Sequence, residues 1–426
     1  MQLVTAPNIA QKLEAIGGLT PAKPIYLLHE WEQTELLSLT QADRAALSEL
    51  NARLSNSVRI EDTPGGSTLS VRQFVGIFEL PSFILQVLPK SLIQPKNLVF
   101  MLARAVALKR ADLPNTYLSA APSDLQEELA HLFLQTLQAE LQRGVTRHYR
   151  EKEDNLPVLR GKLRVAAYLR RPHPLHLPVR YAELDGDHLL NRVFLFTLHH
   201  LARRLKDRQN LQRVALLREW LAEAGVRRVS TLPPDWEQLS LNRLQHRYQA
   251  AFQLASLLLR GMGVMQKHGP YTVPSFSFDM DRLFEQFMTR VLVEDVLKGQ
   301  AHIHKQGSGL TEPHLFSESV VELKPDLVVE WPGRQPLVID FKNKVLSKTP
   351  DSGDLHQMYV YARHLACTQV VLFYPGDFPP RTWTATGGPP LTVTARAVNL
   401  EMNLHREYGE LLTQLRAHLS QEGLPL

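Results

Sequence analysis

The segment ELKPDLVVEWPGRQPLVIDFKNK, residues 322–344, carries the strongest structural signal in the chain. Two apolar runs, Leu327–Trp331 and Leu337–Phe341, flank the turn-forming sequence Pro332–Pro336. Apolar runs rich in β-branched residues on both sides of a Pro-Gly pair are typical of a β-hairpin. The segment therefore predicts two antiparallel strands that are buried along most of their length.

Charged side chains gather at one end of this predicted hairpin. Asp326 stands where the first strand begins, and Asp340 and Lys342 stand two residues apart near the end of the second. Because side chains alternate along a strand, Asp340 and Lys342 share a face. Two converging carboxylates suit a hard cation such as Mg²⁺, which polarises a phosphoryl oxygen and activates water. A lone Asp-x-Lys pattern is also typical of an exposed strand end with solvated charges.

The arrangement resembles the PD-(D/E)xK nuclease superfamily, here as Pro325-Asp326 followed by Asp340-Phe341-Lys342. That resemblance implies a restriction-endonuclease-like α/β domain with a central mixed sheet. It also implies a glutamate on a preceding helix, and Glu285 in the predicted helix from Phe278 matches that position. A RecB-like subset adds Gln-x-x-x-Tyr on the following helix, which Gln357 and Tyr361 supply one turn apart.

By this resemblance Asp326, Asp340 and Glu285 are the expected metal ligands. Lys342 is expected to assist the attacking water or offset charge in the transition state. Gln357 and Tyr361 are expected to position the site or the DNA strand. Taken singly, Glu285 is more typical of a solvated helix carboxylate, and Gln357 and Tyr361 of ordinary surface and packing residues.

Composition sets the broad class of the protein. The chain has 426 residues, 44% of them hydrophobic and 21% charged, with a formal net charge of +5. These values are typical of a globular protein of two or three domains with a mildly basic balance. The single cysteine, Cys367, excludes an internal disulfide. No signal peptide and no apolar run of membrane-spanning length is visible, so we expect a soluble, cytoplasmic protein without a membrane partner.

The chain divides into three predicted parts. Residues 1–94 predict a β-rich module after a loosely held start at 1–24, residues 95–265 a mainly helical region, and residues 266–426 the nuclease-like domain. The Gly- and Pro-containing segment 261–277 is the expected linker between the last two.

Within the helical region, residues 143–171 are strongly basic. They contain nine Lys and Arg against three Asp and Glu, with Tyr149 and Tyr168 interleaved. Such a stretch is able to follow a phosphate backbone, but a charge run is just as often a solvated face.

Ordered segments along the chain give a sharper resemblance, to the McrC family of nuclease subunits from McrBC-type modification-dependent restriction systems. The segments are FVGIFELPSFILQVLPKSL at 74–92, LPVLRGKLRV at 156–165, ELDGDHLLNRVF at 183–194, FDMDRLFEQF at 278–287, the hairpin motif, and QMYVYA at 357–362. Each string alone is weak, whereas their order together with the nuclease motif is specific.

The McrC resemblance implies a partner that the residues alone do not reveal. McrC-like subunits act with a McrB-like AAA+ ring that hydrolyses GTP, and their N-terminal part docks into the ring and stimulates hydrolysis. By this resemblance residues 1 to about 265, with the module at 1–94, are the expected docking part, and residues 266–426 the nuclease. This chain has no G-x-x-x-x-G-K-[ST] motif, in keeping with GTP being bound by the partner. Arg59 and Arg72 are candidates for contact with the GTPase centre. Recognition of the modified base is expected to belong to the partner.

The predicted function is therefore that of a Mg²⁺-dependent DNA endonuclease subunit of a McrBC-like restriction system, acting on double-stranded DNA with methylcytosine-type modification. Two alternatives stay open. One is an adaptor that mainly activates the GTPase ring, and the other is a stand-alone RecB-like repair nuclease. Cleavage without a partner would favour the second, and GTPase stimulation without cleavage the first.

Overall fold

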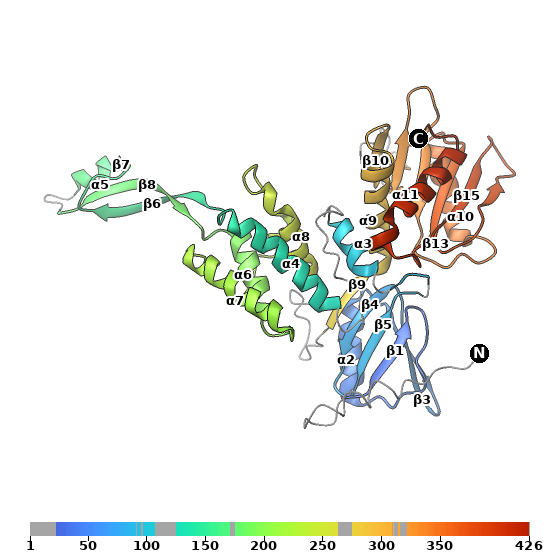
Figure 1. The fold of residues 1–426 in the computed structure, drawn as a ribbon, viewed down its shortest axis with the longest axis horizontal. Coiled ribbons are helices and arrows are strands. Elements are labelled where there is room, and N and C mark those ends of the chain that lie inside the picture. The colour runs from blue at the N-terminus through green and yellow to red at the C-terminus, as the bar shows by residue number, and fades with distance from the viewer. Residues whose placement is uncertain are drawn as a thin grey trace.

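The computed structural model describes residues 23–90, 92–94, 97–106, 125–170, 175–262, 275–308, 310, 314–315 and 322–425. The expected loose start at 1–24 lies almost wholly outside these residues. Of the expected linker at 261–277, residues 263–274 lie outside them, whereas 275–277 belong to a strand. Figure 1 shows the described chain as a helical bundle with a β-arm at one end and two sheet-containing parts at the other. The chain is a mixed α/β protein, which confirms the predicted class.

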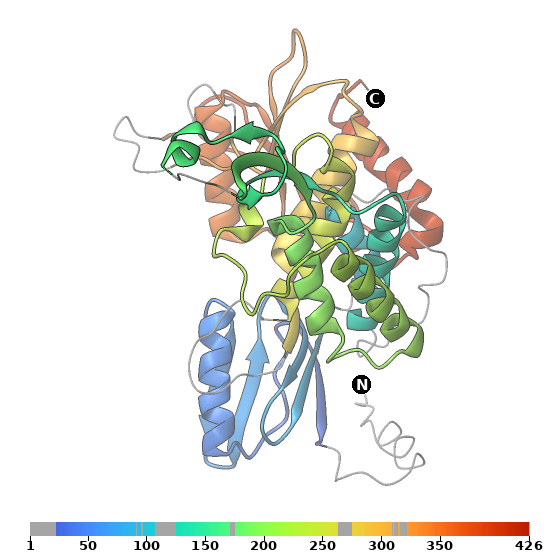
Figure 2. The same ribbon diagram turned by 90° about the vertical axis from the view of Figure 1, so that its left-hand side faces the viewer.

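The N-terminal part is a four-stranded mixed sheet with the order β1-β5-β4-β9. Strands β1 and β5 are parallel, and β4 is antiparallel to both β5 and β9. Helix α2 (Gln41–Arg53) lies along one face of this sheet (Figure 2), and Leu47 and Leu50 are fully buried in the shared core. The strands are β1 (Ile25–His29), β4 (Phe74–Glu79), β5 (Ile84–Leu88) and β9 (Ser275–Asp279), with a separate hairpin of β2 (Val58–Thr63) and β3 (Gly66–Val71).

Strand β9 comes from a distant part of the sequence. The predicted division places residues 275–279 in the C-terminal part, but their hydrogen bonds join them to β4. The chain then runs directly from β9 into the helix that carries Glu285. The last strand of the N-terminal sheet is therefore followed, without a loop, by the first helix of the C-terminal part.

The middle of the chain is a helical bundle whose apolar stripes form one core. Phe133, Phe194, Trp236 and Tyr248 are fully buried at its centre. Helix α4 packs against α7 and α8, and α6 packs against the same two helices. The bundle contains α4 (Leu125–Gln142), α6 (Leu189–Leu201), α7 (Arg208–Glu223) and α8 (Gln249–Gly261), with short 3-10 turns at Trp236–Gln238 and His246–Tyr248. Helix α3 (Asn97–Ala105) contacts α4 but packs mainly on α9 of the C-terminal part.

The basic stretch 143–171 forms part of an exposed β-arm, which the sequence did not predict. Strands β6 (His148–Leu156) and β8 (Leu177–Asp185) pair along nine residues, which corresponds to about 30 Å of extended chain. Strand β7 (Lys162–Leu163) and helix α5 (Val165–Leu169) cap the arm. In Figure 1 the arm extends from the bundle on the side opposite the C-terminal sheet.

Much of the arm's positive charge has a partner within the arm. Glu183 pairs with Lys152 and Arg160, Glu153 pairs with Arg164 and Arg180, and Arg150 pairs with Asp185. Such exposed pairs add little stability. They do mean that the stretch presents less uncompensated charge to a phosphate backbone than its sequence suggests.

The C-terminal part is a six-stranded mixed sheet with the order β10-β11-β12-β13-β15-β14. Helix α10 covers one face, where Met358 and Tyr361 pack on Val338. Helices α9 and α11 cover the other, where Phe284 and Leu411 join the core that contains Ile339. The elements are α9 (Met280–Arg290) with its π-helical extension Val291–Val296, β10 (His302–Lys305), β11 (Leu327–Glu330), β12 (Leu337–Phe341), α10 (Ser352–His364), β13 (Gln369–Pro375), β14 (Arg381–Thr384), β15 (Thr392–Val398) and α11 (Leu404–Gln421).

None of the helices in the described part of the chain combines the length and the apolar character needed to cross a membrane.

Candidate active site

The predicted hairpin is present as β11 and β12, with Leu327 opposite Ile339. Arg334 N donates to the Trp331 carbonyl at 3.1 Å, which closes the turn, and Gly333 has φ +74°. Proline at the second and glycine at the third turn position fit the left-handed geometry of a type II turn. The turn fixes the register of the two strands and so brings Asp326 alongside the end of β12.

The alternation of faces along β12 follows the prediction. Ile339 and Phe341 pack on the α9 side, where Phe341 stacks on Phe373 and meets Phe284 edge-on. Val338 belongs to the opposite core, under α10. Asp340 and Lys342 share the face of Val338 and form an ion pair, with 2.8 Å between Asp340 Oδ2 and Lys342 Nζ.

Asp326 is fixed by the neighbouring strand. Its Oδ2 accepts a hydrogen bond from Phe341 N at 2.7 Å, and its carbonyl accepts one from Gln306 N at 3.0 Å. Burial, reinforced by the nearby charges of Asp340 and Glu285, raises the pKa of Asp326 to about 8. The two aspartates therefore share a site in which a second negative charge is unfavourable.

Asp340 is 2% exposed. Burial raises its pKa, although Lys342 acts in the opposite direction. The Lys342 ammonium lies within ion-pair distance of Asp340 Oδ2, yet this oxygen has no partner in hydrogen-bond geometry among the described residues. A buried carboxylate oxygen of this kind has an unused lone pair, which suits coordination of a hard cation.

Lys342 is linked to α10 by a chain of hydrogen bonds. Its Nζ donates to Gln357 Oε1 at 3.0 Å, and Gln357 Nε2 donates to the Tyr361 hydroxyl at 2.9 Å. Burial lowers the pKa of Lys342, but the surrounding carboxylates of Asp340, Asp354 and Asp326 outweigh it and the net pKa is raised. Lys342 is therefore a cation at neutral pH and offers the cavity a positive charge and hydrogen-bond donors.

Glu285 lies on α9 at the edge of the same site. Its Oε1 accepts a hydrogen bond from Gln306 Nε2 at 2.7 Å. In the part of the chain that the structure describes, no three His, Cys, Asp or Glu side chains are gathered closely enough to form a metal site by themselves. The donor set that fits a metal is therefore the pair Asp326 and Asp340, and Glu285 would have to leave Gln306 to join them.

Five of the six predicted residues line one open cavity of 540 Å³: Glu285, Asp326, Asp340, Lys342 and Gln357. The sixth, Tyr361, is buried behind Gln357 and reaches the cavity only through it. Helix α9, the hairpin and α10 thus contribute side chains to one space at the end of the sheet. Whether these residues act in catalysis stays a prediction.

Sequence reasoning missed several polar residues around this cavity. Gln306, which hydrogen-bonds both Glu285 and the Asp326 backbone, follows β10 and has a positive φ of 47°. No pattern in the sequence marks it. Asp354 does have a signal, because it stands one helical turn before Gln357 and so shares its face. It lies 3.8 Å from Lys342 and 3.1 Å from Lys344.

The two arginines suggested for the GTPase contact both lie in the N-terminal part, away from this cavity. Arg59 on β2 pairs with Glu61 at 3.0 Å. The Arg72 guanidinium lies 5.7 Å from the centre of the Trp31 ring. Each arginine thus contacts a residue of the N-terminal part, and the suggested contact with the GTPase centre stays a prediction for both.

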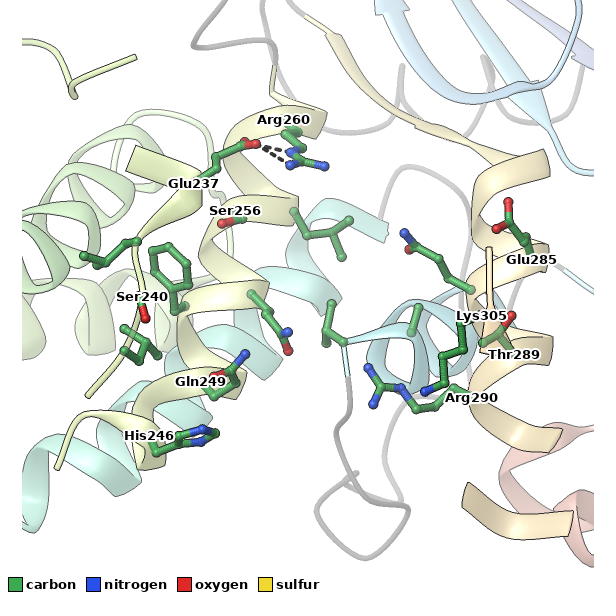
Figure 3. A pocket seen from close by; sticks show the side chains of 18 of the residues that line it. Glu237, Ser240, His246, Gln249, Ser256, Arg260, Glu285, Thr289, Arg290 and Lys305 are labelled. Atoms are coloured by element: carbon green, nitrogen blue, oxygen red, sulfur yellow. Dashed lines mark hydrogen bonds and ion pairs between the residues drawn. The ribbon is translucent and has the colours of Figure 1, made fainter. Parts of the chain in front are cut away.

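A second cavity of 710 Å³ adjoins the first between α8 and α9. Glu285, Gln286 and Gln306 line both cavities. Figure 3 shows Gln249, Ser256 and Arg260 on one wall of this space, with Glu285, Thr289 and Arg290 on the other. The candidate site therefore opens towards the helical bundle along one side of α9.

Comparison with known proteins gives the following likenesses. A family model described as "McrBC 5-methylcytosine restriction system component" matches residues 69–375. A chain in the half-complex of Thermococcus gammatolerans McrB AAA+ hexamers with bound McrC is 24% identical, with a TM-score of 0.64, over 93% of this chain and 99% of that chain. A chain in the T. gammatolerans McrBC complex is 27% identical over 63% and 87%, with a TM-score of 0.46. No curated protein matches. The first likeness shows a shared fold over nearly the full length of both chains.

Proposed function

Because this chain belongs to the McrBC 5-methylcytosine restriction system component family, we propose that it is the nuclease subunit of such a system. The observation that carries the proposal is the convergence of Asp326, Asp340 and Lys342 in one cavity at the end of a mixed sheet. The order of motif residues and the helices on both sheet faces support a PD-(D/E)xK endonuclease domain in the C-terminal part.

In this proposal Asp326 and Asp340 hold Mg²⁺, with Glu285 as a weaker third ligand. The raised pKa values of the two aspartates support this assignment, because a bound cation would offset their unfavourable second negative charge. A bound Mg²⁺ would polarise the scissile phosphate and lower the pKa of a water molecule.

The protein's own residues then provide orientation and charge. Lys342, held between Asp340 and Gln357, presents a fixed ammonium to the cavity, where it would stabilise negative charge that develops on the phosphate. Gln357 keeps Lys342 in place and is itself fixed by Tyr361. The cavity that holds the site is open and adjoins the space between α8 and α9, so double-stranded DNA would approach it from the side of the bundle.

We further propose that a McrB-like AAA+ ring is the partner and that the β-arm docks into it. The structurally similar chain comes from an assembly of McrB AAA+ hexamers with bound McrC. The arm exposes large apolar side chains that no other part of the described chain covers: Tyr149, Val158, Leu159, Val165, Leu169, Leu175 and Leu184. Several large exposed apolar side chains on one projecting element are typical of a protein interface.

The backbone geometry at Gly161 indicates that the tip of the arm has a defined structure. Its φ is +74°, and a Cβ at this position would come within 2.4 Å of the Arg180 carbonyl. Only glycine fits such a close approach between β7 and β8 without displacing the backbone. The tip geometry that presents Leu159 and Val165 therefore depends on this residue.

The test of the function is plasmid cleavage by the purified chain with Mg²⁺, with and without its McrB-like partner and GTP, on methylated and unmethylated DNA. We expect cutting only when partner, GTP and methylated DNA are all present. Cutting by the chain alone would show a stand-alone repair-type nuclease. Stimulation of GTP hydrolysis without any cutting would show an adaptor.

The docking role of the arm predicts a separate result. The double variant Leu159→Asp, Leu169→Asp should weaken stimulation of the partner's GTPase at least about 30-fold, since buried apolar anchors dominate interfaces. Both residues are exposed, at 61% and 76%, so the melting temperature should stay unchanged. The measurement is GTP turnover by the partner as a function of the concentration of this chain.

A matched control is Leu244→Asp, since Leu244 is 77% exposed but lies outside the arm. This variant should stimulate the partner as the unchanged chain does. Equal stimulation by the arm variant and the control would show that the arm is not the docking element.

A further inference from the structure

One buried contact joins the N-terminal sheet to the candidate active site. Strands β1 and β5 are parallel, with His29 opposite Leu88, so their carboxyl ends lie together. Glu30 follows β1 and Lys90 follows β5 at this edge. The Lys90 ammonium donates a hydrogen bond to the carbonyl of Asn343, the residue directly after Lys342.

Glu30 holds Lys90 from the other side. Lys90 N donates to Glu30 Oε1 at 3.3 Å, and the Lys90 ammonium lies 3.8 Å from Glu30 Oε2. The two side chains are 10% and 0% exposed. Burial raises the pKa of Glu30 to about 7 and lowers that of Lys90, so the pair sits in a strongly desolvated place. Burying such an ion pair costs free energy, so the pair is better suited to fix the orientation of Lys90 than to stabilise the fold.

Asn343 is also held from α9. Its Nδ2 donates to Asp281 Oδ1 at 3.0 Å, and Asp281 lines the same cavity as Lys342. The segment after β12 is further tied by Lys342 N, which donates to the Phe373 carbonyl at 2.9 Å, and by Lys344 N, which donates to the Lys342 carbonyl at 2.8 Å. The donor to the Asn343 carbonyl is the Lys90 ammonium, which belongs to the N-terminal part.

We infer that Lys90, oriented by Glu30, is a positioning residue for the proposed site: it fixes the peptide after Lys342 and so sets where the Lys342 ammonium stands relative to Asp340. This inference rests on the proposed nuclease function. Lys90 does not line the cavity, and it acts through Asn343. Through this hydrogen bond the N-terminal sheet helps to hold the proposed site in place.

The experiment compares Lys90→Met with the double variant Glu30→Gln, Lys90→Met. In the single variant Glu30 loses its cation, and both stability and positioning suffer. The double variant removes both charges, so burial is no longer penalised, yet the donor to Asn343 is still missing. The control is Lys23→Met, since Lys23 forms an exposed pair with Glu79 in the same sheet-containing part.

Two readouts separate this inference from the function on which it rests. The first is hydrogen exchange, followed by mass spectrometry, of a peptide that covers residues 341–346. We expect at least about tenfold faster exchange of the Lys342 and Lys344 amides in both Lys90 variants, with the strands of the N-terminal sheet unchanged in the double variant. This readout does not need any DNA cutting.

The second readout is the rate constant of cutting at saturating DNA with the partner and GTP. A misplacement near 1 Å lowers rates about 100-fold, so we expect a loss of about 10- to 100-fold in both Lys90 variants with little change in the DNA concentration for half-maximal rate. Lys23→Met should behave as the unchanged chain.

The outcomes are distinguishable. Unchanged exchange at residues 342–344 in the Lys90 variants would overturn the positioning role, and so would a double variant that cuts at the original rate. Absence of cutting by the unchanged chain would contradict the nuclease function, while faster exchange in the variants would still show the structural link.

Discussion

Replacing Asp340 by asparagine is expected to lower DNA cutting by about 1000-fold. Asp340 is the most buried acid of the site, and its Oδ2 forms an ion pair with Lys342 Nζ at 2.8 Å. Asp340→Asn keeps the shape of the side chain but removes the charge that would bind the metal and orient the lysine.

Folding should survive this change. A buried neutral amide costs less than a buried carboxylate, and Lys342 keeps Gln357 at 3.0 Å and Asp354 at 3.8 Å. We therefore expect an unchanged or slightly higher melting temperature, and unchanged stimulation of the partner's GTPase. The measurement is plasmid cutting with partner and GTP, alongside thermal unfolding.

The control for this variant is Asp351→Asn. Asp351 pairs with Lys344 nearby, but its side chain is 67% exposed and does not line the cavity. It should cut DNA at the original rate. If Asp340→Asn cuts as fast as this control, Asp340 is not part of the catalytic site.

A second large effect concerns stability and pH. Asp326 keeps its proton in the folded state up to a pKa of about 8, whereas an unfolded aspartate ionises near its ordinary 3.8. Between these values the folded state binds more protons, so the free energy of unfolding falls as pH rises through this window. At about 1.4 kcal/mol per unit, the upper limit of the loss is on the order of 6 kcal/mol.

Asp326→Asn should remove most of this slope, because the amide does not ionise and its oxygen still accepts from Phe341 N. Added Mg²⁺ at pH 8 should raise the melting temperature of the unchanged chain by neutralising the paired carboxylates, and leave that of Asp326→Asn nearly unaltered. The measurement is denaturant unfolding from pH 5 to pH 8, with and without Mg²⁺.

Glu322→Gln serves as the comparison, since Glu322 belongs to the same segment but pairs with Lys324 at the surface. It should show the same pH slope and the same response to Mg²⁺ as the unchanged chain. A flat profile for the unchanged chain, or an equal slope in Asp326→Asn, would contradict the shared-proton description of the two aspartates.

The hairpin and its charged end were predictable because their signals are local. The turn sequence sets the register, and strand alternation then fixes the shared face of Asp340 and Lys342. Helical spacing likewise placed Gln357 next to Tyr361. These relations depend on residues that are close together in the sequence.

The relations that were not predictable join distant segments. Strand β9 pairs with β4, which precedes it in the sequence by the whole helical region. Gln306 hydrogen-bonds Glu285 from a turn whose sequence has no distinctive pattern. The ion pairs of the arm needed the pairing of β6 with β8, which brings acids from 183–185 beside the basic stretch. Long-range pairing of this kind is set by the tertiary fold rather than by local propensity.

The placement of β9 has a consequence for synthesis of the protein. Strand β4 ends at Glu79, but the strand that covers its edge begins only at Ser275. A ribosome that adds 5–20 residues per second needs on the order of 10–40 s to make the intervening chain. During that time the nascent N-terminal sheet has an open edge, which is a template for wrong pairing. Chaperone binding to the nascent chain in this interval is therefore expected to raise the yield of folded protein.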